Sequence, residues 1–197
     1  MGHRRDHEWL ETFEGPGADR YDRHARWMRG LHERTARRVA GSLPPGGRYV
    51  DVGTGPGTLV AGVAGLRSDV TVTGIDASAR MVEIASARLA PVADAGRGRV
   101  LVGDAAALPL PDASVDVVTA VLTMHHWEDL RAGVAELARV LLPGGTALIV
   151  EMRGPARDIG RELRQAFHPV LVERGNAWVA GLPLLVRLTT RAGDRAS

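Results

Sequence analysis

The sequence has 197 residues, of which 45% are hydrophobic, and this is enough for one domain with a buried core. It contains no cysteine, which excludes disulfides, thiolate nucleophiles and thiolate metal sites. The isoelectric point is about 9.8, yet the formal charge is only +2. Because there is no lysine and only two tyrosines, few groups titrate above neutrality, so the high isoelectric point does not indicate a nucleic-acid-binding surface.

Neither a membrane span nor a secretory signal is predicted. No apolar run approaches the roughly 20 residues that cross a bilayer. The first eight residues are polar and lack the apolar core of a signal peptide. We therefore expect a cytoplasmic protein.

The N-terminal part of the chain predicts a loose arm followed by a helix. Residues 1–20 are polar and contain a Gly-Pro-Gly breaker. Over residues 21–40, apolar side chains recur on one helical face, while arginine and histidine fill the other. A Pro-Pro-Gly-Gly run at 44–47 ends this helix. We predict an N-terminal arm and helical cap over residues 1–44 and, within the same single domain, a main body over residues 45–197.

The middle of the chain alternates between strand-like and helix-like patterns. Strands are predicted at 48–52, 70–75, 99–103, 115–122 and 146–151, and helices at 58–66, from Ser78 onward, and at 128–142. Strands that alternate with helices form βαβ units, so we expect an α/β fold with a doubly wound, mostly parallel sheet. The tail is less regular, and it predicts a helix at 158–167 and two closing strands at 170–173 and 184–190.

Three glycines follow the first strand at positions 53, 55 and 57. Glycine permits a sharp turn and a close approach of backbone to ligand, and the N–H groups of the next helix favour an anionic group. The nicotinamide fingerprint requires glycine where this chain has Thr58, and the phosphate loop requires a lysine, which is absent. By itself the turn fits both a structural strand–helix connection and a carboxylate or phosphate site.

Acidic residues lie in or just after the first three strands, at Asp51, Asp76 and Asp104. Ligands of a doubly wound sheet bind beyond the carboxyl ends of its strands, where all three would meet. At the end of the second strand, Asp76 can accept hydrogen bonds from both hydroxyls of a ribose. The alternative is a carboxylate that stabilises a helix N-terminus through the helix dipole.

At this point the chain resembles a known family. Five stretches, in order, are similar to the motifs of class I S-adenosylmethionine-dependent methyltransferases: D-V-G-T-G-P-G-T-L at 51–59, I-D-A-S-A-R-M-V-E-I-A at 75–85, G-D-A-A-A-L-P-L-P-D-A-S-V-D at 103–116, M-H-H-W at 124–127 and R-V-L-L-P-G-G-T-A-L-I-V-E at 139–151. The resemblance is closest to the small-molecule branch that includes the ubiquinone/menaquinone-biosynthesis type. It implies a Rossmann-like sheet of seven strands that ends in an antiparallel hairpin.

The resemblance also implies a role for individual residues toward S-adenosylmethionine. The methionine end would be held by Asp51 and by the turn with Gly53, Thr54, Gly55 and Gly57; the ribose by Asp76, with Ala77 beside the adenine; the adenine by Asp104 and the backbone of Ala105; and the sulfonium would be bordered by Leu122 and Thr123. Tyr21, a candidate substrate-site residue, matches a tyrosine that can cap the cofactor site.

Methyl transfer from a sulfonium is an in-line displacement in which positioning and desolvation supply most of the acceleration. A general base is needed only where the acceptor must lose a proton. His125 is the first candidate because it follows the fourth strand, and His126 is the second. Alternatively, one of these histidines caps the next helix and Trp127 packs as the anchor of a lid.

Motifs that are absent narrow the acceptor. Enzymes that methylate nucleobase amines or glutamine amides often carry an N/D-P-P-Y/F/W motif after the fourth strand, where this chain has Thr-Met-His-His. The fifth strand is followed by Glu151-Met152-Arg153 rather than an Asp-Asn pair, so we predict no metal. We expect a small-molecule methyl acceptor and no nucleic-acid partner. The alternatives are an RNA or protein methyltransferase and a non-catalytic S-adenosylmethionine-binding protein.

Overall fold

The computed structural model describes residues 28–152, 155–167, 170–174, 178–179, 182–183 and 186–191. Tyr21 and the predicted N-terminal arm lie outside these residues. None of the helices in the described part of the chain is long and apolar enough to cross a membrane.

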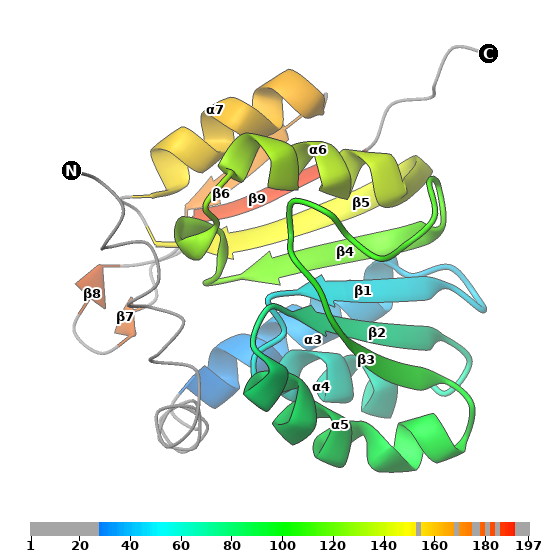
Figure 1. Ribbon diagram of the computed structural model, residues 1–197. Helices are drawn as coiled ribbons and strands as arrows, with labels where there is room; N and C mark the ends of the chain where they lie inside the picture. The colour runs from blue at the N-terminus through cyan, green and yellow to red at the C-terminus, as the bar shows by residue number, and fades with distance from the viewer. Residues whose placement is uncertain are drawn as a thin grey trace.

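A twisted sheet of order β3-β2-β1-β4-β5-β9-β6 forms the centre of the fold (Figure 1). Its parallel strands are β1 (Arg48–Val52), β2 (Thr71–Asp76), β3 (Gly98–Val102), β4 (Val115–Val121) and β5 (Leu141–Glu151). Beyond β5, β9 (Val186–Arg191) pairs antiparallel with β5, and the edge strand β6 (Val170–Arg174) pairs antiparallel with β9. A separate two-stranded ribbon pairs β7 (Trp178–Val179) with β8 (Leu182–Pro183). The predicted α/β fold with a parallel core is confirmed.

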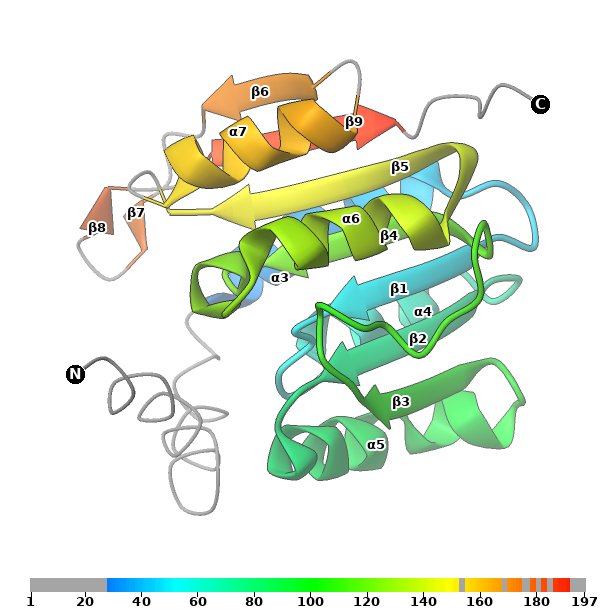
Figure 2. The ribbon, with the colours of Figure 1, turned by 45° about the horizontal axis from the view of Figure 1, so that its top comes forward.

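Helices cover both faces of this sheet (Figures 1 and 2). One face carries α3 (Arg29–Ser42), α4 (Thr58–Leu66) and α5 (Ala79–Asp94), and the other carries α6 (Leu130–Val140) and α7 (Ala156–Ala166). Each layer encloses its own apolar core. The α4 side buries Val60, Val63 and Val72, and the α6 side buries Val118, Leu137 and Ile149. The two cores explain why the central strands are apolar on both faces.

Element boundaries differ most from the prediction around β5. We predicted a helix to residue 142 and a strand from 146, but α6 ends at Val140 and β5 begins at Leu141. Leu141 pairs with Val115, and the register then shifts before Val117 pairs with Thr146. The predicted Pro-Gly-Gly stop lies between these two pairs, where Gly144 has a φ of 75°, so a local turn forms within the irregular start of the strand.

The start of α5 matches its sequence signal. The Ser78 hydroxyl accepts the Met81 N–H at 3.2 Å, as expected for an N-cap. The helix then continues through Pro91 to Asp94. Val92 packs against the apolar core beside Leu89, which holds the helix together past the proline.

Candidate functional site

The chain order of the strands reverses between β1 and β4. From β1 the sheet continues to β2 and β3 on one side and to β4 and β5 on the other. Gly53 follows β1 and Thr123 follows β4, and a Cβ atom on Gly53 would lie 2.6 Å from the Thr123 Cβ. The two strand ends therefore touch at the switch point, where α/β proteins of this kind bind their ligands.

The glycine turn adopts a backbone that other residues rarely adopt. Gly53, Gly55 and Gly57 have φ angles of 69°, 53° and 74°. The N–H groups of Gly53 and Thr54 donate to the Ile75 carbonyl at 2.8 and 3.0 Å, which anchors the turn to β2. Gly57 is the N-cap of α4 and offers no side-chain cap, so the first N–H groups of the helix are available to an anionic group.

Asp51 lies beneath this turn and is almost fully buried, at 3% exposure. Its carboxylate accepts hydrogen bonds from the Thr119 hydroxyl and, at 2.9 Å, from the Thr54 hydroxyl. The Tyr49 hydroxyl lies 2.7 Å from Thr119 Oγ1 and extends the buried network. Burial raises the pKa of Asp51 to about 7, and the two threonine hydrogen bonds partly oppose this. A cation bound nearby would favour the ionised carboxylate.

Asp76 and Asp104 lie at the ends of neighbouring strands, as predicted. Asp76 accepts the Gly55 N–H at 2.7 Å and the Ser78 N–H at 3.0 Å, so it joins the glycine turn to the start of α5. The Gly103 N–H donates to the Asp76 carbonyl at 3.0 Å, which places Asp104 next along the edge. Ala77 is exposed and Ala105 half-buried beside these acids.

No helix occurs between β3 and β4 in the structure, and the connecting loop at 103–114 is held by Arg139 of α6. The Arg139 guanidinium donates to the Leu108 and Leu110 carbonyls at 3.1 and 2.8 Å, and to Asp112 at 2.7 Å. It also pairs with Glu136, whose pKa it holds below the usual range. This tether fixes the loop that begins at Asp104.

The chain is strained where it leaves β4. Leu122 has a φ of 54°, which is unusual for a residue with a branched side chain. Its N–H donates to the Val150 carbonyl at 2.8 Å, so pairing with β5 holds the strained residue in place. The turn directs Thr123 toward Gly53, and a short 3₁₀ helix, η2 (Met124–His126), follows. Backbone strain of this kind is concentrated at functional sites.

The two candidate histidines lie at the β4 side of this edge. Nδ1 of His125 is 2.9 Å from Oε1 of Glu151, the last residue of β5. The His126 ring centroid is 4.0 Å from that of His125, and burial, followed by the neighbouring His125, lowers the pKa of His126. The expected alternative, a histidine cap on α6, is wrong, because Asp129 caps that helix by accepting the Ala132 N–H at 2.8 Å.

Glu151 was not predicted to be part of the site. Its side chain is 0% exposed, and its Oε2 atom has no hydrogen-bond partner in the described part of the chain. The available signal was a charged residue at the end of an otherwise apolar strand, the same signal that singled out Asp76.

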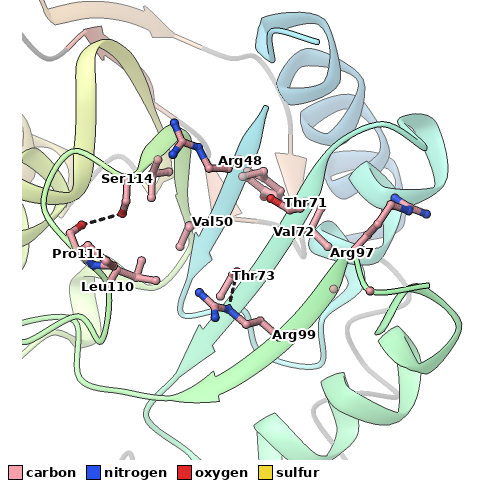
Figure 3. Close-up of a pocket in the computed structure, with 14 residues that line it drawn as sticks. Arg48, Val50, Thr71, Val72, Thr73, Arg97, Arg99, Leu110, Pro111 and Ser114 are labelled. Carbon is pink, nitrogen blue, oxygen red and sulfur yellow. Dashed lines mark hydrogen bonds between the residues drawn. The ribbon is translucent and has the colours of Figure 1, made fainter. Parts of the chain in front are cut away.

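A separate cavity of about 400 Å³ lies at the opposite end of the strands (Figure 3). Its lining includes Arg48, Thr71 and Gly98, the first residues of β1, β2 and β3. Arg99 lies across its wall and donates to Thr73 Oγ1 at 3.3 Å. Because ligands of this fold bind beyond the carboxyl ends of the strands, the candidate site is the glycine-turn edge and not this cavity.

Among the described residues, no three histidine, aspartate or glutamate side chains are grouped as they would be to hold a metal ion. The predicted cofactor-site residues from Asp51 to Thr123 all lie at one edge of the sheet, together with His125 and His126.

Comparisons with known proteins agree with this geometry. Residues 50–149 match the family model described as a methyltransferase domain. The chain is 37% identical over 112 residues to the ubiquinone/menaquinone biosynthesis C-methyltransferase UbiE of Geotalea daltonii, a match that covers 56% of this chain and 48% of that protein. It is 42% identical over 120 residues to the 27-O-demethylrifamycin SV methyltransferase of Amycolatopsis mediterranei, over 58% of this chain and 44% of that protein. The chain thus matches about half the length of these relatives.

Solved structures show the same fold. A putative S-adenosyl-L-methionine-dependent methyltransferase from Methanococcus maripaludis aligns with a TM-score of 0.75 at 18% identity, over 93% of this chain and 95% of that one. The [4+2]-cyclase SpnF aligns with a TM-score of 0.69 at 23% identity, over 82% and 81% of the two chains. The family match, the sheet order and the glycine turn at the switch point together show that this chain belongs to the class I S-adenosylmethionine-dependent methyltransferase family.

Proposed function

We propose that this protein transfers a methyl group from S-adenosylmethionine to a small-molecule acceptor by in-line displacement. The observation that carries the proposal is the edge at the β1–β4 switch point, where Asp76 joins the glycine turn to α5. When bound, S-adenosylmethionine supplies a methyl group on a positively charged sulfur that is already activated toward a nucleophile.

The residues at this edge fit that cofactor. S-adenosylmethionine carries an ammonium and a sulfonium, and Asp51 is a buried carboxyl whose charged form needs a nearby cation. The cofactor's carboxylate suits the first N–H groups of α4, which the N-cap Gly57 leaves without a side-chain partner. The turn requires glycine at position 53, since a Cβ atom there would collide with Thr123.

We assign the residues as follows. The methionine end is held by Asp51, Gly53, Thr54, Gly55 and Gly57, the ribose hydroxyls by Asp76, and the adenine by Ala77, Asp104 and Ala105, while Leu122 and Thr123 border the sulfonium. His125 is the candidate base, and His126 is its neighbour.

The acceptor binds on the β4–β5 side of the same edge. The N-terminal helix and the segment after Glu151 shape its pocket, and Tyr21 is a candidate contact. Relatives named as a ubiquinone/menaquinone biosynthesis C-methyltransferase and as a 27-O-demethylrifamycin SV methyltransferase support a small-molecule acceptor. A cytoplasmic location and the absence of a nucleic-acid partner belong to this proposal.

Calorimetry with S-adenosylhomocysteine tests the cofactor assignment. Asp76→Ala removes charge-assisted hydrogen bonds and should weaken binding by about 10- to 100-fold. Asp94→Ala, at the exposed end of α5, is the matched control and should bind like the unmodified protein. Lack of any binding would refute the proposed function.

Turnover then distinguishes the classes of protein. Release of S-adenosylhomocysteine should occur with a metabolite extract. Release with an RNA pool or a protein fraction instead would indicate a macromolecular acceptor. Binding of S-adenosylhomocysteine without its release in any of these incubations would indicate a non-catalytic role. This alternative is tested because the fold is not confined to methyl transfer, as the likeness to a cyclase shows.

A further inference from the structure

Glu151 is a fully buried carboxylate at the end of β5. The preceding residue, Val150, packs with Leu31 of α3, and because successive side chains of a strand point to opposite faces, Glu151 lies on the other face, with Ile149 on the α6 side. Its Oε1 atom accepts the Met152 N–H at 2.8 Å and lies 2.9 Å from Nδ1 of His125. Its Oε2 atom is buried without a hydrogen-bond partner in the described residues. Burial of a carboxylate in such surroundings is costly, so an apolar residue would suit the strand better.

The contact with His125 indicates what the Glu151 carboxylate does at this site. Oε1 already accepts one N–H from the backbone, and it serves as the acceptor for His125 Nδ1 as well. The proton of neutral His125 is therefore held on Nδ1, and the lone pair of Nε2 is left to accept a proton. The His125 side chain is 18% exposed, whereas Glu151 is fully enclosed, so the histidine is the member of the pair that can meet an acceptor.

His126 is a titratable neighbour of this pair. Its ring centroid lies 4.0 Å from that of His125 with the planes tilted by 44°, and burial, followed by His125, lowers the pKa of His126. His125 lies two residues beyond Thr123, which contacts Gly53 at the glycine turn. The His125–Glu151 pair therefore lies where the glycine-turn side of the edge meets the β4–β5 side.

We propose that Glu151 is a positioning residue that keeps Nε2 of His125 free as a proton acceptor, and that the methyl acceptor is consequently a hydroxyl compound. The inference rests on the proposed function and narrows its acceptor. The hydroxyl proton passes to His125 Nε2, an oxygen electron pair bonds to the methyl carbon, and the carbon–sulfur bond breaks with its electrons going to sulfur. The Glu151 carboxylate stabilises the imidazolium, which afterwards loses its proton to solvent. A hydroxyl is a weak nucleophile until it loses its proton, so it is an acceptor that gains from this base.

The positioning role can be measured without cofactor. In ¹⁵N NMR of the free protein, neutral His125 should be almost entirely the Nδ1–H tautomer, and Glu151→Gln should shift it toward a mixture of tautomers. Glu128→Gln, an exposed carboxylate after η2, is the matched control and should leave the spectrum of His125 unchanged. An Nε2–H tautomer in the unmodified protein would overturn the positioning role, whatever the outcome for Glu151→Gln.

Activity separates a positioning role from a structural one. His125→Ala should lower kcat by about 10²- to 10⁴-fold and regain part of it with added imidazole. Glu151→Gln should lower kcat by about 10- to 100-fold. Both variants should bind S-adenosylhomocysteine within about 3-fold of the unmodified protein, since neither is assigned to the cofactor. Unchanged kcat in both variants would overturn the inference and leave the proposed function intact.

The acceptor class follows from the product. With S-adenosylmethionine labelled in its methyl group and a metabolite extract of the source organism, the label should appear in an O-methyl ether. Label in an N-methyl or C-methyl group would overturn the hydroxyl assignment. A protein that binds no S-adenosylhomocysteine and transfers no label would instead refute the proposed function on which the inference rests.

Discussion

The two halves of the candidate edge are built differently. On the β1–β3 side, the glycine turn, Asp76 and Asp104 lie at or just after the end of a strand and are held by nearby backbone groups. On the β4–β5 side, His125 meets Glu151 across 26 residues, and Leu122 is strained to make the junction. The first half has the features of a cofactor cradle, and the second has those of a reactive pair. In such a site the methyl donor can stay the same while the residues around the methyl acceptor change.

The largest effect is expected where the two halves touch. Gly53→Ala would place a Cβ 2.6 Å from the Thr123 Cβ at a φ of 69°. The left-handed backbone and the clash together should destabilise the fold by about 3 kcal/mol or more. Binding of S-adenosylhomocysteine should fall by at least about 100-fold, as measured by calorimetry beside thermal unfolding.

Gly46→Ala is the control for backbone strain alone. Gly46 has a φ of 67° but open space around its Cβ position. It should cost about 1 kcal/mol and leave affinity unchanged. If Gly53→Ala behaved like Gly46→Ala, the two halves would not be in the contact described.

The next largest effect is expected at Asp51, which lies beneath the glycine turn on the cofactor side of the edge. Because its folded pKa is raised from 3.8 to about 7, its contribution to stability is full below pH 3.8 and is lost as pH rises through about 7. Asp51→Asn should match the unmodified protein in acid and exceed its stability at pH 8 by up to roughly 4 kcal/mol. Denaturant unfolding at pH 4 and pH 8 measures this.

Cofactor binding should respond in the opposite sense. Binding of S-adenosylhomocysteine to the unmodified protein should tighten between pH 6 and pH 8 as Asp51 ionises, and Asp51→Asn should lose this dependence. The exposed Asp69 is a control for the pH dependence of stability. Its pKa is lowered, chiefly by its hydrogen bond from Arg67, so its effect on stability has the opposite sign to that of Asp51. Asp69→Asn should lose stability at pH 8 and not in acid. The same pH response in Asp51→Asn as in the unmodified protein would argue against a cation at Asp51.

The smallest effect is expected at the tether between the halves. Arg139→Met removes the bonds from α6 to the loop that begins at Asp104 and should lower stability by about 1–3 kcal/mol. Affinity for S-adenosylhomocysteine should fall by roughly 3- to 10-fold, since only the adenine end depends on this loop. Arg131→Met, on the exposed side of the same helix, should change neither. An equal loss in both variants would show that the tether does not order the loop.

Much of the fold and of the donor half could be predicted because its signals are local. Alternating patterns located the five parallel strands, and acids at strand ends located Asp76 and Asp104. The start of β5 was missed because Leu141 pairs with Val115 ahead of the Pro-Gly-Gly turn, and this pairing between distant residues has no local signal. The Arg139 bonds that hold the loop at 103–114 had no local signal either.

The sequence by itself determined the parallel α/β architecture, the glycine turn and the acids that follow the first strands, since each depends on residues within one βα unit. Only the tertiary structure decided that Thr119 would reach Asp51 across 68 residues, that Gly53 would lie against Thr123, and that Glu151 would hold His125. These contacts depend on the order β1-β4-β5 in the sheet. No local pattern encodes that order, because it results from the packing of whole strands and helices around two shared cores.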